Sequence, residues 1–548
     1  MNSKMDPRTR VLLEAPLVRT LLRLAVPNVL VLGAQAAAGL VETYFIGKLG
    51  TESLAGVALV FPVVMLMQMM SGGAMGGGIS SAIARALGAS RRADGNALVL
   101  HAVIIALVFG LSFTLGVLGG GRWLYGAMGA QGRSMSAALI YSDWIFAGAV
   151  LIWLFNSLAA VIRATGNMVV PAIVTLAGTA ILIPLSPVLI FGWGPFPALG
   201  IAGGAIALLG YYAAGSGVLW LYLWSGKSVL RPSIRGVRLR WSLFRDILRV
   251  GAVAALVSLS TNLTIMIGTA MVGQFGTAAI AGYGTGARLE YLLVPLVFGL
   301  GAPMVAIVGT SIGAGNRARA LRVAWIGAGI ATALTEAIGL GAAAFPHAWL
   351  SLFDADPGVL DSGARYLREV GPFYGMLGLA LSLYFASQGA GRLGWPLAGN
   401  LVRLAIAAAG GFAALRWTGD LSYVFLAQSA ALVAFGLINA VSVAGGAWFG
   451  GLRWPTRNPA SYIRNQFVKP DTKNSASDAL RTHGANTVRA RPNFMEAASS
   501  RRFTGMVTPA SSRRDRRERA QGSPRVVEPE ADARRLDTVT EHCADSGR

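Results

Sequence analysis

Long apolar stretches dominate this chain and are separated by short polar segments. A run of about 20 apolar residues can cross a bilayer as an α-helix. Strands of a membrane barrel would instead alternate apolar and polar residues, and these stretches do not. The pattern predicts an all-α integral membrane protein with twelve transmembrane helices, expected over 18–46, 53–83, 96–118, 134–162, 168–192, 199–225, 246–273, 278–312, 322–345, 364–389, 395–415 and 421–450.

Composition supports a lipid environment and bears on the partners. The 548 residues are 54% hydrophobic and only 13% charged, whereas soluble domains carry about 25% charged residues. The lipid bilayer is therefore the expected surrounding. A net charge of +22 raises the question of nucleic acid. The basic residues lie in predicted loops and in the tail, so no nucleic-acid partner is expected.

Basic loops predict the orientation. Arginines and lysines gather in the N-terminal arm, after the second and eighth helices, and between the sixth and seventh, while the loop near 354–361 is acidic. Cytoplasmic loops carry the excess of Lys and Arg. We therefore expect a multi-pass protein of the inner (plasma) membrane with both termini in the cytoplasm.

The chain contains an internal repeat. GKLGTESLAG (47–56) is echoed by GQFGTAAIAG (273–282), Tyr141 by Tyr366, and IRATGN (162–167) by SQGAGR (387–392). Six helices in each half give both halves one orientation, which is a parallel repeat about an axis along the membrane normal. The expected organisation is a cytoplasmic arm (1–17), an N-lobe (18–225), a cytoplasmic linker (226–245), a C-lobe (246–450) and a basic tail (451–548) that is too polar to bury a core.

Five motifs in order carry a family resemblance. Besides the repeated glycine element they are IRATGN, LIFGWGPFPALGIAGGAIA (189–207), YGTGARLEYLLVP (283–295) and VGTSIGAGN (308–316). Together they resemble the multidrug and toxic compound extrusion (MATE) family, in its bacterial branch near the DNA-damage-inducible transporters. The resemblance implies two six-helix lobes around a central cavity. It also implies export of organic, often cationic, compounds driven by inward H⁺ or Na⁺.

Glu42 is the first candidate for ion coupling. It lies in the outer part of the first predicted helix, where an ionisable residue is costly and rarely idle. A partly dry cavity disfavours the charged form of a carboxyl, so Glu42 can take up a proton outside and release it inside. By resemblance it occupies the place of the family's first-helix acid, which is usually Asp. The alternative is that Glu42 reaches water and only ends the helix.

Two differences bear on the coupling ion. Where relatives carry an Asp in the fifth helix this chain has Ser186, and the repeat partner of Glu42 is Gly268. A Na⁺ ion favours several oxygen ligands, as other hard cations do, so a lone carboxyl favours H⁺ over Na⁺. Glu290 in the eighth helix is a second coupling candidate. Arg288 and Glu290 pairing with other helices to hold the lobe is the preferred interpretation, and Glu336 is a weaker candidate.

Several polar residues are expected to line the central cavity. Asn and Gln between membrane helices often only bond a neighbouring helix, which is the alternative for each of them. The candidates are Gln35, Gln68, Asn156, Ser186, Thr261, Asn262, Arg288 and Gln388.

No catalytic, metal or cofactor site is expected. A GxxxxGK[ST] phosphate loop is absent from the sequence, and the four histidines are scattered. The sequence thus predicts a monomeric secondary antiporter that exports a small organic substrate, coupled to protons. The alternatives are a Na⁺-coupled exporter, a flippase for lipid-linked precursors, whose cavity would be strongly basic, and a receptor or scaffold that transports nothing.

Overall fold

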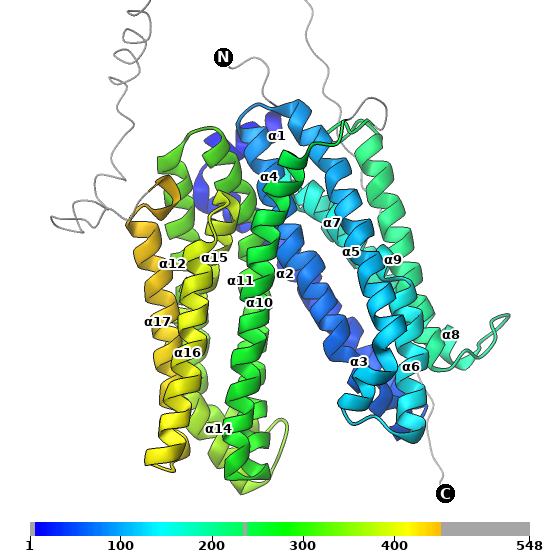
Figure 1. Cartoon of the computed structure of the whole chain (residues 1–548), viewed down its shortest axis with the longest axis vertical. Helices are drawn as coiled ribbons and strands as arrows, with labels where there is room; N and C mark the ends of the chain where they lie inside the picture. Colours follow the sequence, from blue (N-terminus) through cyan, green and yellow to red (C-terminus); the bar gives the residue numbers. More distant parts are fainter. Residues whose placement is uncertain (1–5, 234–237, 451–548) are drawn as a thin grey trace, which may run out of the picture. The chain divides into compact units, whose positions relative to one another are not determined.

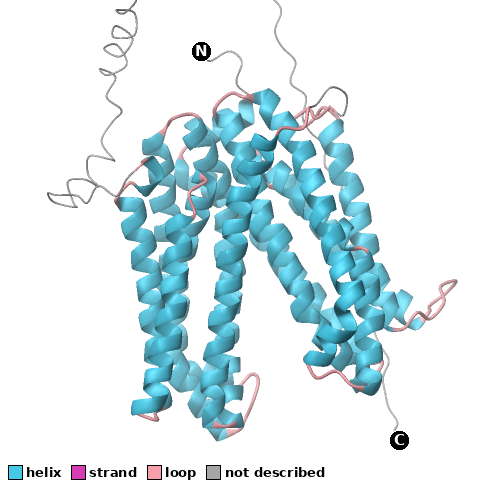
Figure 2. Ribbon diagram, viewed as in Figure 1, coloured by secondary structure: helices cyan, strands magenta, loops and turns pink. Residues whose placement is uncertain are grey.

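The computed structural model describes residues 6–233 and 238–450 and shows a helical membrane protein. Within these ranges no strand occurs (Figure 2). Eleven helical segments are long and apolar enough to span a membrane, and α6 with α7 forms a twelfth that is bent by 48°. The predicted all-α class with twelve spans is therefore confirmed. The segment 451–548, predicted as a tail, lies outside the described residues.

The helices follow the predicted order (Figure 1). The first half contains α1 (Pro7–Glu14), α2 (Leu17–Gly47), α3 (Thr51–Gln68), the π-helix η1 (Met69–Met75), α4 (Gly76–Gly88), α5 (Arg92–Ala127), α6 (Gly132–Ala147), α7 (Ala149–Ala164), α8 (Val169–Phe191) and α9 (Ile201–Trp224). The second half contains α10 (Trp241–Val272), η2 (Gly273–Phe275), α11 (Thr277–Gly313), α12 (Arg317–Ala344), α13 (Pro346–Leu350), α14 (Pro357–Val370), η3 (Gly371–Phe373), α15 (Tyr374–Ala390), α16 (Gly394–Trp417), α17 (Leu421–Ala444) and η4 (Ala447–Phe449). We call α2–α9 the N-lobe and α10–α17 the C-lobe.

The repeated glycine element forms the same turn in both lobes. Gly50 before α3 has φ 112° and Gly276 before α11 has φ 102°. Side chains rarely adopt such angles, so glycine is needed at both places. By its contacts the chain divides into Met1–Lys469, which holds every described residue, and Pro470–Arg548.

Buried apolar side chains form three clusters. One lies mainly in the N-lobe and includes Trp153, and one includes Tyr366 and lies within the C-lobe. The third joins C-lobe helices to Leu21 and Ala25 in the first half of α2. The start of α2 therefore packs on the C-lobe, and the junction between the lobes runs along this helix.

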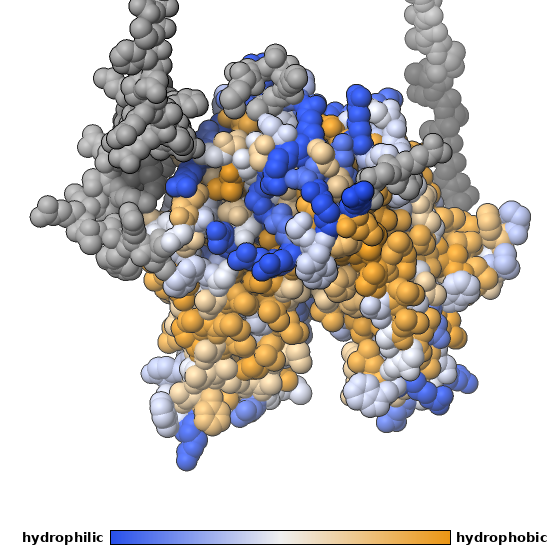
Figure 3. Space-filling model, turned by 45° about the horizontal axis from the view of Figure 1, so that its top comes forward, coloured by the Kyte–Doolittle hydropathy of each residue, from blue (hydrophilic) through white to orange (hydrophobic). Residues whose placement is uncertain are grey.

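The lobes are joined at one end of the helices, which we call the basic end because Arg85, Arg91, Arg240 and Arg319 lie there. Here Arg85 Nη2 forms an ion pair with Asp246 Oδ1 at 2.7 Å. Among the described residues, the inter-lobe polar contact farthest from this end joins Asn262 Nδ2 to Met69 Sδ at 4.0 Å. Figure 3 shows a deep notch between the lobes at the opposite end.

Two glycines allow this close approach. Gly88 at the end of α4 and Gly313 at the end of α11 occupy equivalent positions of the repeat. A methyl group on Gly88 would overlap the carbonyl oxygen of Thr310, and one on Gly313 would overlap that of Arg85. Each lobe thus presents a glycine to the other lobe's backbone. We call this symmetric contact between the lobes at the basic end the seal.

The helix that carries each glycine is irregular in its middle, by different means. Between α3 and α4 the backbone forms the π-helix η1. The equivalent stretch of α11 stays α-helical and contains Pro295. Pro303 lies further along the same helix. A proline lacks the backbone N–H and interrupts the helical hydrogen bonds, so each of the two helices has an irregular turn at the same depth.

Candidate functional site

Glu42 lies inside the N-lobe and is bound by a tyrosine. The Tyr141 hydroxyl of α6 donates to Glu42 Oε1 at 3.0 Å. Gly204 of α9 makes room, since a Cβ there would lie 3.4 Å from the same oxygen. Among the described residues Glu42 takes part in no ion pair. Its carboxyl is thus held by a neutral partner, so it can be charged or protonated without leaving a buried cation unpaired.

The equivalent tyrosine of the C-lobe also binds a glutamate, from a different helix. Tyr366 donates to Glu290 Oε2 at 3.3 Å, and Arg403 Nη2 of α16 lies 3.1 Å from Glu290 Oε1. The Arg403 side chain is 7% exposed and that of Glu290 is 20% exposed. Glu290 is thus paired with a buried cation from another helix, Arg403 of α16.

Removal of the Glu290 charge is expected to cost stability. Glu290→Gln leaves Arg403 buried without an acid, and breaking a buried pair costs about 3–5 kcal/mol. We expect a clear fall in the melting temperature of the detergent-purified protein. The control is Glu52→Gln, which removes an exposed pair with Arg133 at 3.8 Å and should cost about 1 kcal/mol or less. Equal melting temperatures for the two variants would contradict the structural role of Glu290.

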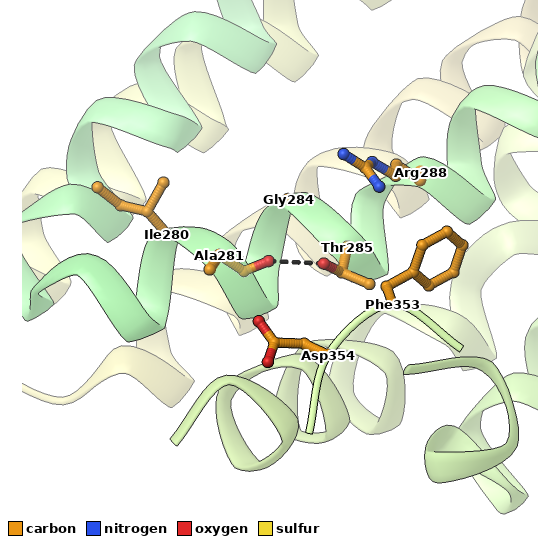
Figure 4. Close-up of a pocket in the computed structure, with 7 residues that line it drawn as sticks. All are labelled: Ile280, Ala281, Gly284, Thr285, Arg288, Phe353 and Asp354. Carbon is orange, nitrogen blue, oxygen red and sulfur yellow. Dashed lines mark hydrogen bonds between the residues drawn. The ribbon is translucent and has the colours of Figure 1, made fainter. Parts of the chain in front are cut away.

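Arg288 lies at the edge of a pocket near the outer end of the C-lobe. The pocket holds about 410 Å³. The Arg288 guanidinium lies 5.4 Å from the centre of the Phe353 ring, and Asp354 borders the same space (Figure 4). Arg288 is therefore close to an aromatic ring and a loop acid, and its place in a central cavity stays a prediction.

Glu336 and Ser186 differ in how their buried oxygens are satisfied. The Gly375 N–H donates to Glu336 Oε2 at 2.6 Å, which binds an otherwise free donor in the first turn of α15. Glu336 therefore has a structural task at the break between α14 and α15. Ser186 is 3% exposed, and its hydroxyl has no hydrogen-bond partner among the described residues.

Two of the predicted cavity residues in the N-lobe form a network. Asn156 Nδ2 donates to Gln68 Oε1 at 3.1 Å and to Ser71 Oγ at 2.8 Å, and Gln68 donates to the Tyr212 hydroxyl. The network ties η1 to α7 and α9. Gln35 lies on α2 and is exposed.

The predicted residues of the C-lobe mostly bond within that lobe. Thr261 Oγ1 donates to the Val257 carbonyl at 2.9 Å and accepts from Asn400 Nδ2 at 3.1 Å. Asn262 Nδ2 donates to the Ser258 carbonyl at 2.8 Å. That Thr261 and Asn262 line the central cavity stays a prediction.

Gln388 lies at the seal between the lobes. Its Nε2 donates to the Gly73 carbonyl at 3.3 Å, and Ser81 donates to its backbone carbonyl. A small cavity of about 20 Å³ at this seal is lined by Gln388, Arg163 and glycines of η1 and α4. Within the described ranges, no group of three or more His, Cys, Asp or Glu residues is arranged to hold a metal ion.

The sequence pattern does not indicate four of the residues at these sites, Tyr141, Arg163, Arg403 and Arg85. The repeated pair Tyr141 and Tyr366 was visible in the sequence, and each tyrosine turns out to hold a glutamate. The partners of Arg85 and Arg403 are 161 and 113 residues away in the chain. No local pattern indicates such pairs.

A match to a known family identifies the protein family of this chain. The MatE family model matches residues 27–188 and 254–412, one segment in each lobe. The chain belongs to the MATE family. Members of this family are membrane transporters, so this MATE protein is a transporter of drug- or toxin-like organic compounds and not an enzyme.

Relatives and solved structures agree with this membership. The chain is 30% identical over 400 residues to the FAD transporter of Shewanella oneidensis, covering 72% of this chain and 87% of the relative. It is 26% identical over 390 residues to a probable multidrug resistance protein NorM of Thermotoga maritima, covering 69% and 82%. A MOP superfamily transporter from Pyrococcus furiosus has the same fold, with a TM-score of 0.74 at 22% identity, covering 80% of this chain and 97% of that one.

Proposed function

We propose that this chain is an antiporter that exports organic compounds by alternating access, driven by inward proton flow through Glu42. The observation that carries the proposal is the bond between Glu42 and Tyr141 at 3.0 Å without a cation. Glu290 is compensated by Arg403, and Glu336 is bound by a backbone N–H. Of these three glutamates, Glu42 is therefore the one whose protonation leaves no partner unsatisfied.

The orientation follows from the charges. The basic end faces the cytoplasm under the positive-inside rule, and the first and last described elements, α1 and η4, contact Arg319 and Arg317 at this end. The joined basic end and the open opposite end then correspond to an outward-open state. Glu42 lies near the open end of α2 and receives its proton from outside. Movement of the lobes exposes it to the cytoplasm, where it loses that proton.

The energetics allow one proton to suffice. A proton moving through ~150 mV releases about 3.5 kcal/mol, at about 2.3 kcal/mol per 100 mV. A tenfold gradient of a neutral solute costs about 1.4 kcal/mol. One proton per neutral molecule therefore supports a gradient of roughly 300-fold, and a single carboxyl is enough.

Sodium is the less favoured coupling ion. Na⁺ favours a cage of several oxygens. The Tyr141 hydroxyl is the hydrogen-bond partner of the Glu42 carboxyl, and Ser186 stands at the fifth-helix position where the family resemblance implies an Asp. These features supply too few charged oxygens for a sodium cage.

Two kinds of cargo fit the relatives. The relatives are named for multidrug resistance or for FAD, and FAD carries a pyrophosphate. Export of such an anionic dinucleotide is the second candidate beside drug-like compounds. A flippase for lipid-linked precursors, which also carry pyrophosphate, stays the third.

Everted membrane vesicles test the coupling. Substrate uptake into the lumen is measured with an inside-acid pH gradient, with a Na⁺ gradient and with neither. We expect uptake with the pH gradient and its loss when that gradient is collapsed by an ionophore. Uptake that follows the Na⁺ gradient alone would contradict proton coupling.

A further inference from the structure

Arg163 is a cation at the junction of the two lobes. It lies at the end of α7 and lines the small cavity at the seal. Among the described residues no hydrogen bond, ion pair or ring contact involves its guanidinium. Arg85 at the same end pairs with Asp246, and Arg403 pairs with Glu290. A cation kept in a partly buried place without an acid is costly unless a ligand binds it.

The surroundings of Arg163 suit a charged, flat molecule. Gln388, which occupies the equivalent position of the repeat, lines the same cavity. Its Nε2 donates to the Gly73 carbonyl of the other lobe at 3.3 Å and to the Tyr384 hydroxyl at 3.4 Å, so parting of the lobes frees one amide hydrogen for a ligand. Phe298 and Phe385 of the C-lobe line another wall, with ring centres 5.5 Å apart in an edge-to-face arrangement. The glycine face of η1, including Gly73, leaves the backbone open to close approach. One cation, one amide and two rings are therefore grouped around one space.

The charge balance at membrane depth points the same way. Glu290 is compensated by Arg403, Glu336 binds the Gly375 N–H, and Glu42 lies toward the opposite end of its helix. Within the described ranges, no acid lines the cavity beside Arg163. A cationic substrate would meet a like charge here, whereas an anionic group would meet a charge-assisted hydrogen-bond donor.

We propose that this junction is a binding subsite for the anionic group of an aromatic substrate, with Arg163 as its ligand and Phe298 and Phe385 as the platform for the ring. The subsite loads when the lobes part at the basic end. In the present arrangement the space is about 20 Å³, which is room for roughly one water molecule. Closure at this end therefore empties the subsite toward the notch. The inference rests on the proposed alternating access and departs from the expectation of cationic substrates.

Two dyes with one ring system and opposite charges test the subsite. Fluorescein is an anion at neutral pH and rhodamine 123 is a cation, and both contain a xanthene ring. Their uptake into everted vesicles is measured with the full chain, by filtration and lysis in a buffer of fixed pH. We expect wild-type uptake of fluorescein. Arg163→Gln should raise its KM roughly 10- to 100-fold, as for a lost hydrogen bond to a charged group, with rhodamine 123 uptake unchanged.

Matched variants separate binding from folding. Arg163→Lys keeps the charge and should retain more fluorescein affinity than Arg163→Gln. Arg416→Gln removes one exposed arginine at the outer end of α16 and should change neither dye. Two results would overturn the subsite. In the first, Arg163→Gln and Arg163→Lys lose uptake of both dyes to the same extent. In the second, the wild type takes up rhodamine 123 but not fluorescein. Arg163-dependent fluorescein uptake that ignores the pH gradient would support the subsite and count against proton coupling.

Discussion

Glu42→Gln is expected to reduce uptake driven by a pH gradient to the level of vesicles that lack the transporter. Glutamine keeps the size of the side chain and an oxygen that can accept from Tyr141, which lies 3.0 Å from the carboxylate in the wild type. It cannot gain or lose a proton at neutral pH, so the step that links proton flow to lobe movement is removed. The reduction should be complete, because Glu42 is the sole proton carrier in the proposed mechanism.

Substrate exchange without a gradient separates coupling from binding. In vesicles loaded with unlabelled substrate, Glu42→Gln should still exchange it for labelled substrate, since its lobes and binding surface are intact. Asp143→Asn is the control, because Asp143 is an exposed acid on the same helix as Tyr141 and should change neither measurement. Full gradient-driven uptake by Glu42→Gln would remove Glu42 from the mechanism.

Gly88→Val is expected to shift the lobes away from closure at the basic end and to reduce transport strongly. Any Cβ at Gly88 overlaps the carbonyl oxygen of Thr310 in the other lobe, and a backbone atom cannot swing aside. Overpacking of this kind costs about 1–3 kcal/mol, which is a roughly 5- to 150-fold change in the balance between two states. Gly313→Val should have the same effect, because it faces the Arg85 carbonyl in the equivalent way.

The opening can be measured with one reporter thiol. The chain has a single cysteine, Cys543, which is replaced by serine before Ser81→Cys is introduced. Ser81 is fully buried at the seal, so a membrane-impermeant thiol reagent in everted vesicles reaches this position only when the basic end opens. We expect faster labelling in Gly88→Val. Gly116→Val is the control, since no atom lies within 4 Å of a Cβ at that glycine. Unchanged labelling with full transport would contradict the proposed seal.

The helical architecture was predictable because its signal is local. A membrane span needs only length and apolarity, so all twelve spans were found, and the glycine turns before α3 and α11 identified the repeat. Prolines and the glycine-rich segment 71–78 indicate that some spans are interrupted, but the form of the interruptions was not predicted. The break at Gly371–Phe373 and the π-helix at Met69–Met75 depend on how neighbouring helices satisfy the backbone, and the short helix α1 lies in a segment expected only as an arm.

The site was predictable in its residue types and not in its pairings. Glu42 and Glu290 attract attention because a carboxyl is costly in a membrane helix, but their roles depend on partners. Arg403 comes from α16 and Tyr141 from α6, and no spacing rule connects them to the glutamates. Gln388 was expected in the central cavity; in this structure it lines a small cavity at the seal, and its place in a central cavity stays a prediction, because the surroundings of a residue between moving lobes depend on which end is closed.

The helices that carry Gly88 and Gly313 have different irregular turns, and this difference has a mechanical consequence. The π-helix η1 differs from an α-helix in its backbone hydrogen bonds, which join residues i and i+5. Rearrangement of these bonds can shift the π-helical turn or convert it to α-helix. The bend at Pro295 is built into the covalent chain, because the missing N–H cannot be restored. Both helices contain proline, Pro62 in α3 and Pro295 and Pro303 in α11, and the N-lobe helix adds the π-helical turn η1, which α11 lacks. The duplicated halves share one fold, but the two lobes need not change conformation in the same way during the transport cycle.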